Sequence, residues 1–341
     1  MSNITLTKKN TLFREVILEK NIDRSLKFFI YRLLVRYGIR IFGYKKSKIF
    51  YQIIKKLTIN NYNKFFLDIN ILYLESITAV IINDWQKYID SKIKLIHHIL
   101  EKSKNKNEIE AALFYSKILD KKDIFFPDNN KDKKVSKILI YGPNSNTQPI
   151  NDKGYDILVL TKVPKFEIKD FDYVYIYLNN NIANSLEKKD LKLIKSNLFL
   201  FIDDTNLNWQ DTNIYKTIHT PRSVLYSAMG LQRILYDLTF KHSNSFINIL
   251  GFDMYTKTKG YSGKIQTSYP INNIELTEKI MCISLLTHDP VFNFLFTQQV
   301  LKNFILMDDS IEFKELIEND LNRYLALLSS NRKFYILNKL F

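Results

Sequence analysis

The sequence predicts an α/β protein in which a helical N-terminal region and a helical C-terminus flank a mostly parallel, Rossmann-like sheet. Short apolar runs recur between residues 137 and 250 and alternate with segments of helical character. All seven prolines fall between Pro127 and Pro290, and six of the eight glycines fall between Gly142 and Gly263. Helices with few breakers therefore lie on both sides of a central α/β region.

Length and composition set the outer limits. The 341 residues exceed one average domain, so we predict a basic helical region at 1–119, a charged linker at 120–136 and the α/β domain at 137–341. An apolar content of 46% is ample for a core and excludes a disordered chain. Cys282, the single cysteine, permits no internal disulfide. Because the sequence shows neither an apolar leader nor a run long enough to span a membrane, we predict a cytoplasmic location for the protein.

The net charge of +15 is concentrated near the N-terminus. Residues 24–64 hold eleven basic side chains and no acidic one, and such a field attracts phosphates of nucleic acid or of an anionic membrane. The spacing of apolar residues predicts helices at 24–42, 47–57, 66–100 and 107–119. We expect the third of these helices to be broken once. The first helix either lies on the inner membrane surface or is a bundle helix with a solvated basic face.

The central region supplies the strands. We predict strands at 138–141, 157–160, 174–178, 198–202 and 246–250. A helix at 221–240 is expected to begin with Thr220 as its cap and Pro221 at its first position. Residues 290–341 are predicted to be helical.

The segment KILIYGPNSNT, residues 137–147, contains the first predicted strand and the loop after it. Gly142 and Pro143 end the apolar run, and Asn144, Ser145 and Asn146 follow with small, donor-rich side chains. Ligands of open α/β sheets bind beyond the carboxyl ends of strands, so a nucleotide or sugar phosphate is expected here. The alternative is a capped loop without a ligand.

Two other segments are candidates for anion or metal binding. Arg222 and Ser223 lie in the first turn of the predicted helix at 221–240, where they would either bind an anion or only cap the helix. Asp203 and Asp204 follow a predicted strand. Because consecutive strand residues point to opposite faces, these two carboxylates do not easily share one ion, and we predict a helix-capping or loop role for them.

Two further stretches contain candidate catalytic residues. Gly251, Asp253 and Tyr255, with Tyr261 beyond them, place phenols near a strand end, where they would bind a leaving phosphate or simply pack. His288, Asp289 and Pro290 lie at a junction between two apolar helices. The imidazole is a candidate general base, and the alternative is a structural histidine followed by an aspartate that caps the next helix.

Taken in order, these motifs resemble those of bacterial sialyltransferases. The Gly-x-Asn-Ser type of loop, the later Gly-Phe-Asp-x-Tyr strand end and a His motif some 35 residues on are similar to the lipooligosaccharide sialyltransferases of glycosyltransferase family forty-two. Related transferases of Kdo share the layout, and His-Asp-Pro is closer to their His-Pro signature. The resemblance covers roughly residues 137–305, and the chain departs from the sialyltransferases at Pro143 and at Asn293.

The resemblance implies a sialyltransferase-like, GT-A-variant domain that binds a CMP sugar without a metal ion. His288 would be the catalytic base, with Asp289 beside it. Tyr255 and Tyr261 would stabilise the departing CMP phosphate. The implied nucleotide-binding residues are Gly142, Asn144, Ser145, Asn146, Arg222, Ser223, Gly251, Asp253, Tyr255, Tyr261 and Pro290.

The expected function is therefore transfer of sialic acid or a Kdo-like ulosonic acid from a CMP donor to a lipooligosaccharide or capsule acceptor. The partners would be that donor, the glycan acceptor and an anionic membrane surface reached through residues 24–64. Alternatives are a transferase of the same fold that uses another nucleotide sugar, a nucleic-acid-binding protein that uses the basic helices, and an inactive scaffold in a glycan-assembly complex.

Overall fold

The computed structural model divides the chain into two compact units, residues 1–74 with 341 and residues 75–340. Of the first unit it describes only helical residues 68–69 and 71–72. The described residues of the second unit are 75–76, 79, 84–122, 124, 135–142, 154–161, 164, 167–178, 191–202, 213–221, 223, 225–226, 228–254, 256, 289–307 and 311–336, with side chains up to 330 in the last range. The helices predicted at 24–42 and 47–57 lie outside the described residues.

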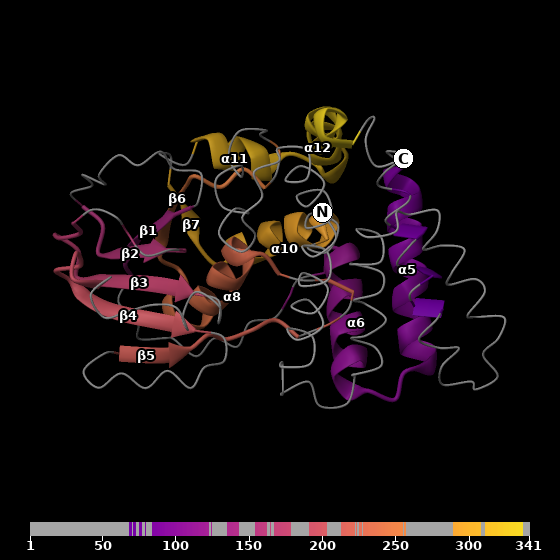
Figure 1. Cartoon of the computed structure of the whole chain (residues 1–341), viewed down its shortest axis with the longest axis horizontal. Helices are drawn as coiled ribbons and strands as arrows, with labels where there is room; N and C mark the ends of the chain where they lie inside the picture. The colour runs from indigo at the N-terminus through magenta and orange to yellow at the C-terminus, as the bar shows by residue number, and fades with distance from the viewer. Residues whose placement is uncertain are drawn as a thin grey trace, which may run out of the picture. The chain divides into compact units, whose positions relative to one another are not determined.

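The described strands form one parallel sheet. Its members are β1 (Lys137–Tyr141), β2 (Ile157–Leu160), β3 (Tyr173–Leu178), β4 (Asn197–Ile202), β5 (Asn213–Lys216), β6 (Phe246–Leu250) and β7 (Ile305–Leu306). They lie in the order β5-β4-β3-β2-β1-β6-β7, and every pairing is parallel (Figure 1). The α/β class and the five predicted strands are confirmed, because each of those apolar runs is a strand within one residue of its predicted start.

Register gives the sheet two differently packed faces. Leu139 pairs with Leu158, and Leu158 with Val174, so these side chains share one face, which carries an aliphatic core. Connecting segments cover part of this face, since Ile168 and Phe171 belong to the same core cluster. The sheet is thus buried in its middle strands, as the continuous apolar runs require.

Helix α8 (Gly230–His242) covers the opposite face, which is rich in aromatic rings. The Tyr177 hydroxyl donates to Asp237 of α8, and the Lys241 ammonium lies 4.0 Å from the centre of the Phe201 ring. The hydroxyl oxygen of Tyr175 lies 3.0 Å from the Nε2 atom of His242. These contacts fix α8 against β3 and β4.

The remaining helices are α5 (Trp85–Lys102), α6 (Lys106–Leu119), α10 (Pro290–Leu301), α11 (Ile311–Glu318) and α12 (Leu321–Ile336). Asp84 caps α5 through the amide of Lys87, and Asn105 caps α6 through that of Asn107. Helix α10 contacts both α6 and α8, so α6 belongs to the same compact unit as the sheet. The predicted division at residues 120–136 stays a prediction, and the compact unit extends across it.

Two predictions about secondary structure need correction. The helix expected at 221–240 begins only at Gly230, and before it the amides of Ile218 and Met229 donate to the side chains of Asp237 and Asn293 instead of making helical bonds. Pro221 is therefore not at a helix start. The C-terminal region also contains a strand, β7, and β5 was not predicted. Both are short edge strands. β5 has no apolar run, and the short apolar run around β7, residues 304–307, closely follows the apolar helix α10.

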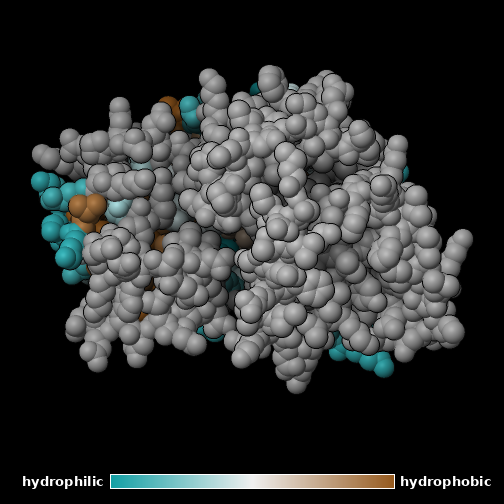
Figure 2. Space-filling view, viewed as in Figure 1, coloured by the Kyte–Doolittle hydropathy of each residue, from teal (hydrophilic) through white to brown (hydrophobic). Residues whose placement is uncertain are grey.

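The ends of the sheet differ in character. Around the amino ends of β3 and β4 the described residues are largely exposed and polar, including Lys169, Asp170, Asp172 and Lys195. Hydrophilic side chains gather at this end in the space-filling view, around a small hydrophobic spot (Figure 2). The carboxyl ends of the strands are where ligands of parallel sheets bind, and the candidate site is built there.

Candidate functional site

The strand order reverses between β1 and β6. From β1 the sheet grows outward through β2 to β5, and the chain then returns to place β6 on the other side of β1. In open α/β sheets, ligands bind in the crevice outside the carboxyl ends of the strands at such a reversal. Here the two strand ends are joined directly, since the amide of Gly142 donates to the carbonyl of Leu250 over 2.7 Å.

Only glycine fits at the end of β1. A Cβ atom at Gly142 would lie 2.5 Å from the carbonyl oxygen of Gly251 and 2.5 Å from a ring carbon of Phe252. Gly251 itself has φ of 71°, a left-handed conformation that glycine adopts without steric cost. The two predicted loops, after β1 and after β6, therefore begin in contact with each other.

The turn after β6 is held by the C-terminal helices. The amide of Thr256 donates to the carbonyl of Asp253 over 2.8 Å, and Asp253 is buried. The hydroxyl of Tyr324 on α12 donates to the carbonyl of Met254 over 3.1 Å, while its ring stacks on Phe294 of α10. Helices α10 and α12 thus fix the backbone that follows the sheet at this point.

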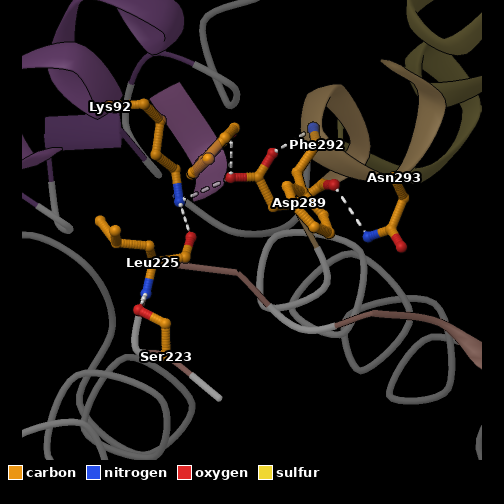
Figure 3. A network of polar contacts seen from close by, with 7 residues as sticks. Lys92, Ser223, Leu225, Asp289, Phe292 and Asn293 are labelled. Carbon is orange, nitrogen blue, oxygen red and sulfur yellow. Dashed lines mark hydrogen bonds and ion pairs between the residues drawn. The ribbon is translucent and has the colours of Figure 1, made fainter. Parts of the chain in front are cut away.

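A second group of polar residues is centred on Asp289 (Figure 3). Its carboxylate oxygen Oδ2 lies 3.0 Å from the ammonium of Lys92 on α5, and both side chains are 1% exposed. The same oxygen accepts a 2.7 Å hydrogen bond from the hydroxyl of Tyr115 on α6. Removing one member of such a buried pair costs about 3–5 kcal/mol, because the other charge is left without compensation.

Asp289 also starts helix α10. Its second oxygen, Oδ1, accepts from the amide of Phe292 over 3.0 Å, and Pro290 occupies the first helical position. The Asn293 side-chain amide donates to the Asp289 carbonyl over 3.0 Å. The cap interpretation of Asp289 is therefore confirmed. A catalytic role for its carboxylate stays a prediction, and both of its oxygens already have protein partners.

Lys92 reaches a second segment of the chain as well. Its ammonium donates to the carbonyl of Leu225 over 2.9 Å. The Leu225 amide in turn donates to the hydroxyl oxygen of Ser223, and that hydroxyl donates to Glu108 of α6 over 2.9 Å. The segment before α8 is thus tied to α5 and α6 by side chains and not by a helical turn.

Tyr115 stays a hydrogen-bond donor across the ordinary pH range. Complete burial raises the pKa of its hydroxyl well above the usual value of 10.0, and the neighbouring Asp289 carboxylate raises it further. The pair of donors, Tyr115 and Lys92, therefore compensates the carboxylate at neutral pH.

The structure brings some of the predicted site residues together and leaves others outside the described residues. Gly142 and Gly251 are brought together at the strand reversal, and Ser223 joins Asp289 through Leu225 and Lys92. The proposal of a helix N-terminus at 220–223 is wrong, because its described residues precede α8 without entering it. Asn144, Ser145, Asn146, Asp203, Asp204, Arg222, Tyr255, Tyr261 and His288 lie outside the described residues.

Sequence reasoning missed Lys92 and Tyr115. One signal was available for Lys92, since the buried positions of α5 follow helical spacing and Lys92 is among them, four residues after Tyr88 and three before Leu95. A lysine inside an apolar stripe indicates a buried partner. No comparable signal marks Tyr115, because tyrosines are common in buried helix faces.

Comparison of the chain with protein-family models, with curated proteins and with solved structures found no significant match in any of the three. Within the described ranges, no cluster of three or more His, Cys, Asp or Glu side chains is arranged to hold a metal ion. None of the helices described is both long and apolar enough to cross a bilayer.

Proposed function

We propose that this chain is a glycosyltransferase that takes a sialic acid or Kdo-like ulosonic acid from a CMP-activated donor. The observation that carries the proposal is the contact between the Gly142 and Gly251 loops at the β1/β6 reversal. These are the two strand ends on which the resemblance to sialyltransferases rests. In the GT-A variant that it implies, the nucleotide would occupy this crevice.

Physical chemistry supports a phosphate-bearing ligand at this place. Backbone amides beyond a strand end are suited to bind phosphate oxygens. The side chains of Asn144 and Ser145, which follow Gly142 in the sequence, would add donors for the phosphate or ribose.

The proposed reaction is a displacement at the anomeric carbon. An acceptor hydroxyl forms the new carbon–oxygen bond, His288 takes the hydroxyl proton, and CMP leaves with the electron pair of the broken bond. Tyr255 and Tyr261 would donate hydrogen bonds to the departing phosphate, so the step would need no metal ion. The acceptor would be a surface glycan reached from the cytoplasmic side, with residues 24–64 on the anionic membrane.

The experiment is a panel of thermal unfolding midpoints with CMP, CDP, UDP and GDP, each in EDTA. A nucleotide at 100 times its Kd stabilises the native state by about 2.7 kcal/mol, which raises the midpoint by roughly 4–5 °C in a protein of this size. A shift with CMP and not with the others is expected. A shift with UDP or GDP alone would replace the donor class, and no shift with any nucleotide would contradict the proposal.

A further inference from the structure

The ammonium of Lys92 joins two segments that are far apart in the sequence. It donates to the Leu225 carbonyl over 2.9 Å and lies 3.0 Å from Oδ2 of Asp289 (Figure 3). The amide of Met229 adds a second link between the same segments by donating to the side-chain oxygen of Asn293 over 3.0 Å. Leu225 and Met229 of segment 223–229 are therefore held at a fixed spacing from segment 289–293 by side chains of α5 and α10.

Both segments adjoin residues of the proposed site. Arg222, a nucleotide-binding residue implied by the resemblance, directly precedes Ser223, and His288, the proposed base, directly precedes Asp289. Any shift of Leu225 relative to Asp289 would therefore move the backbone that leads to these two residues. The anchor points lie three residues from Arg222 and one residue from His288.

The buried pair of Lys92 and Asp289 fixes a defined geometry but adds little to the stability of the fold. A buried lysine and aspartate lose their hydration, and well-packed apolar residues of similar volume often stabilise a protein as well or better. Asp289 also has φ of 53°, a backbone conformation that residues other than glycine rarely adopt. Strained residues of this kind persist where the surroundings determine them, and they cluster at functional sites.

We propose that Lys92 is a positioning residue of the transferase site, because it sets the spacing between the segments that carry Arg222 and His288. This inference rests on the proposed function. It assigns to helix α5 a part in catalysis that the resemblance, limited to residues 137–305, does not include.

The test compares the wild type with the double variant Lys92→Met, Asp289→Asn in the full chain. This change removes both charges, keeps an oxygen at residue 289 that can cap α10, and so leaves no buried charge uncompensated. We expect hydrogen exchange of the amides in 223–229 and 289–293 to become faster together. With a CMP-ulosonic acid donor, kcat should fall by about 100-fold while KM for the donor stays within about threefold.

A control with the same kind of charge removal is available at the exposed pair Lys106 and Glu110 of α6. The double variant Lys106→Met, Glu110→Gln should leave kcat and the exchange of both segments unchanged. The variant Asp289→Asn alone separates the charge of Asp289 from that of Lys92. Its kcat should exceed that of the double variant if Lys92 acts on the Leu225 carbonyl as proposed.

Two results would overturn the inference. One is a double variant at Lys92 and Asp289 whose exchange in both segments matches that of the wild type. The other is a double variant with faster exchange but wild-type kcat, which would make Lys92 purely structural. If the wild type turns over no CMP sugar, the proposed function fails, and the exchange comparison alone then decides whether Lys92 fixes the spacing.

Discussion

The ammonium of Lys92 lies 3.0 Å from the carboxylate of Asp289, and this buried contact joins a helix near the start of the compact unit to the first turn of α10. Residues 85–119 are thereby part of the unit that contains the sheet, although their sequence is typical of a separate helical region. The contact also supplies the most direct test of how this unit is held together.

Lys92→Met alone should lower the free energy of unfolding by about 3–5 kcal/mol, because it leaves the Asp289 carboxylate buried with only the Tyr115 hydroxyl and the Phe292 amide. Adding Asp289→Asn should restore most of that loss. Urea unfolding of the two single variants and the double variant measures the coupling. Additive effects would contradict a direct ion pair.

Alkaline pH should destabilise the protein through Tyr115. Burial raises the pKa of this hydroxyl above its unfolded value near 10, so its contribution is complete below pH 10 and is lost as the pH rises toward the folded pKa. The Tyr115→Phe variant should show a shallower fall of stability above pH 10 than the wild type. Denaturant unfolding across that range measures the slope, and equal slopes would refute the assignment to Tyr115.

Tyr324→Phe should loosen the turn after β6. The substitution keeps the ring that stacks on Phe294 but removes the hydroxyl that donates to the Met254 carbonyl. A buried carbonyl without its donor costs about 1–3 kcal/mol. Thermal unfolding should show that loss, and hydrogen exchange should become faster at residues 251–256. Unchanged exchange there would mean that α12 does not hold the turn.

Gly142→Ala should destabilise the end of β1, because its methyl group would lie 2.5 Å from the Gly251 carbonyl oxygen. Gly230→Ala is the matched control, since nothing lies within 4 Å of a Cβ atom at that position. At the start of α8, alanine should be neutral or stabilise the protein by up to about 1 kcal/mol. Thermal midpoints of the two variants make the comparison, and equal midpoints would argue against close approach at Gly142.

The sequence indicates the interior of the sheet better than its edges. The five apolar runs form strands because buried parallel strands need continuous apolar side chains. Strands β5 and β7 lie at the edges of the sheet. β5 has no apolar run, and the short run at β7 cannot be told from an extension of the apolar helix before it by its pattern alone. Thr220 and Pro221 have the pattern of a helix start, but long-range bonds such as that from Ile218 to Asp237 keep this segment out of a helix.

The candidate site could be predicted in its parts but not in its assembly. Gly142 and Gly251 were each predicted at a strand end, but their contact depends on β6 returning beside β1, which local sequence does not encode. The Lys92–Asp289 pair likewise depends on how α5 meets α10. Only the position of Lys92 on the buried stripe of its helix hints at a partner.

The most direct test of the central claim is a calorimetric titration of CMP into the wild type and into the Gly142→Ala and Gly230→Ala variants. If the nucleotide binds where β1 and β6 end, the wild type and Gly230→Ala should bind CMP equally well. Gly142→Ala should lose most of that affinity at a temperature where it remains folded. Equal affinity of Gly142→Ala and the wild type for CMP, or no binding by the wild type, would contradict the account.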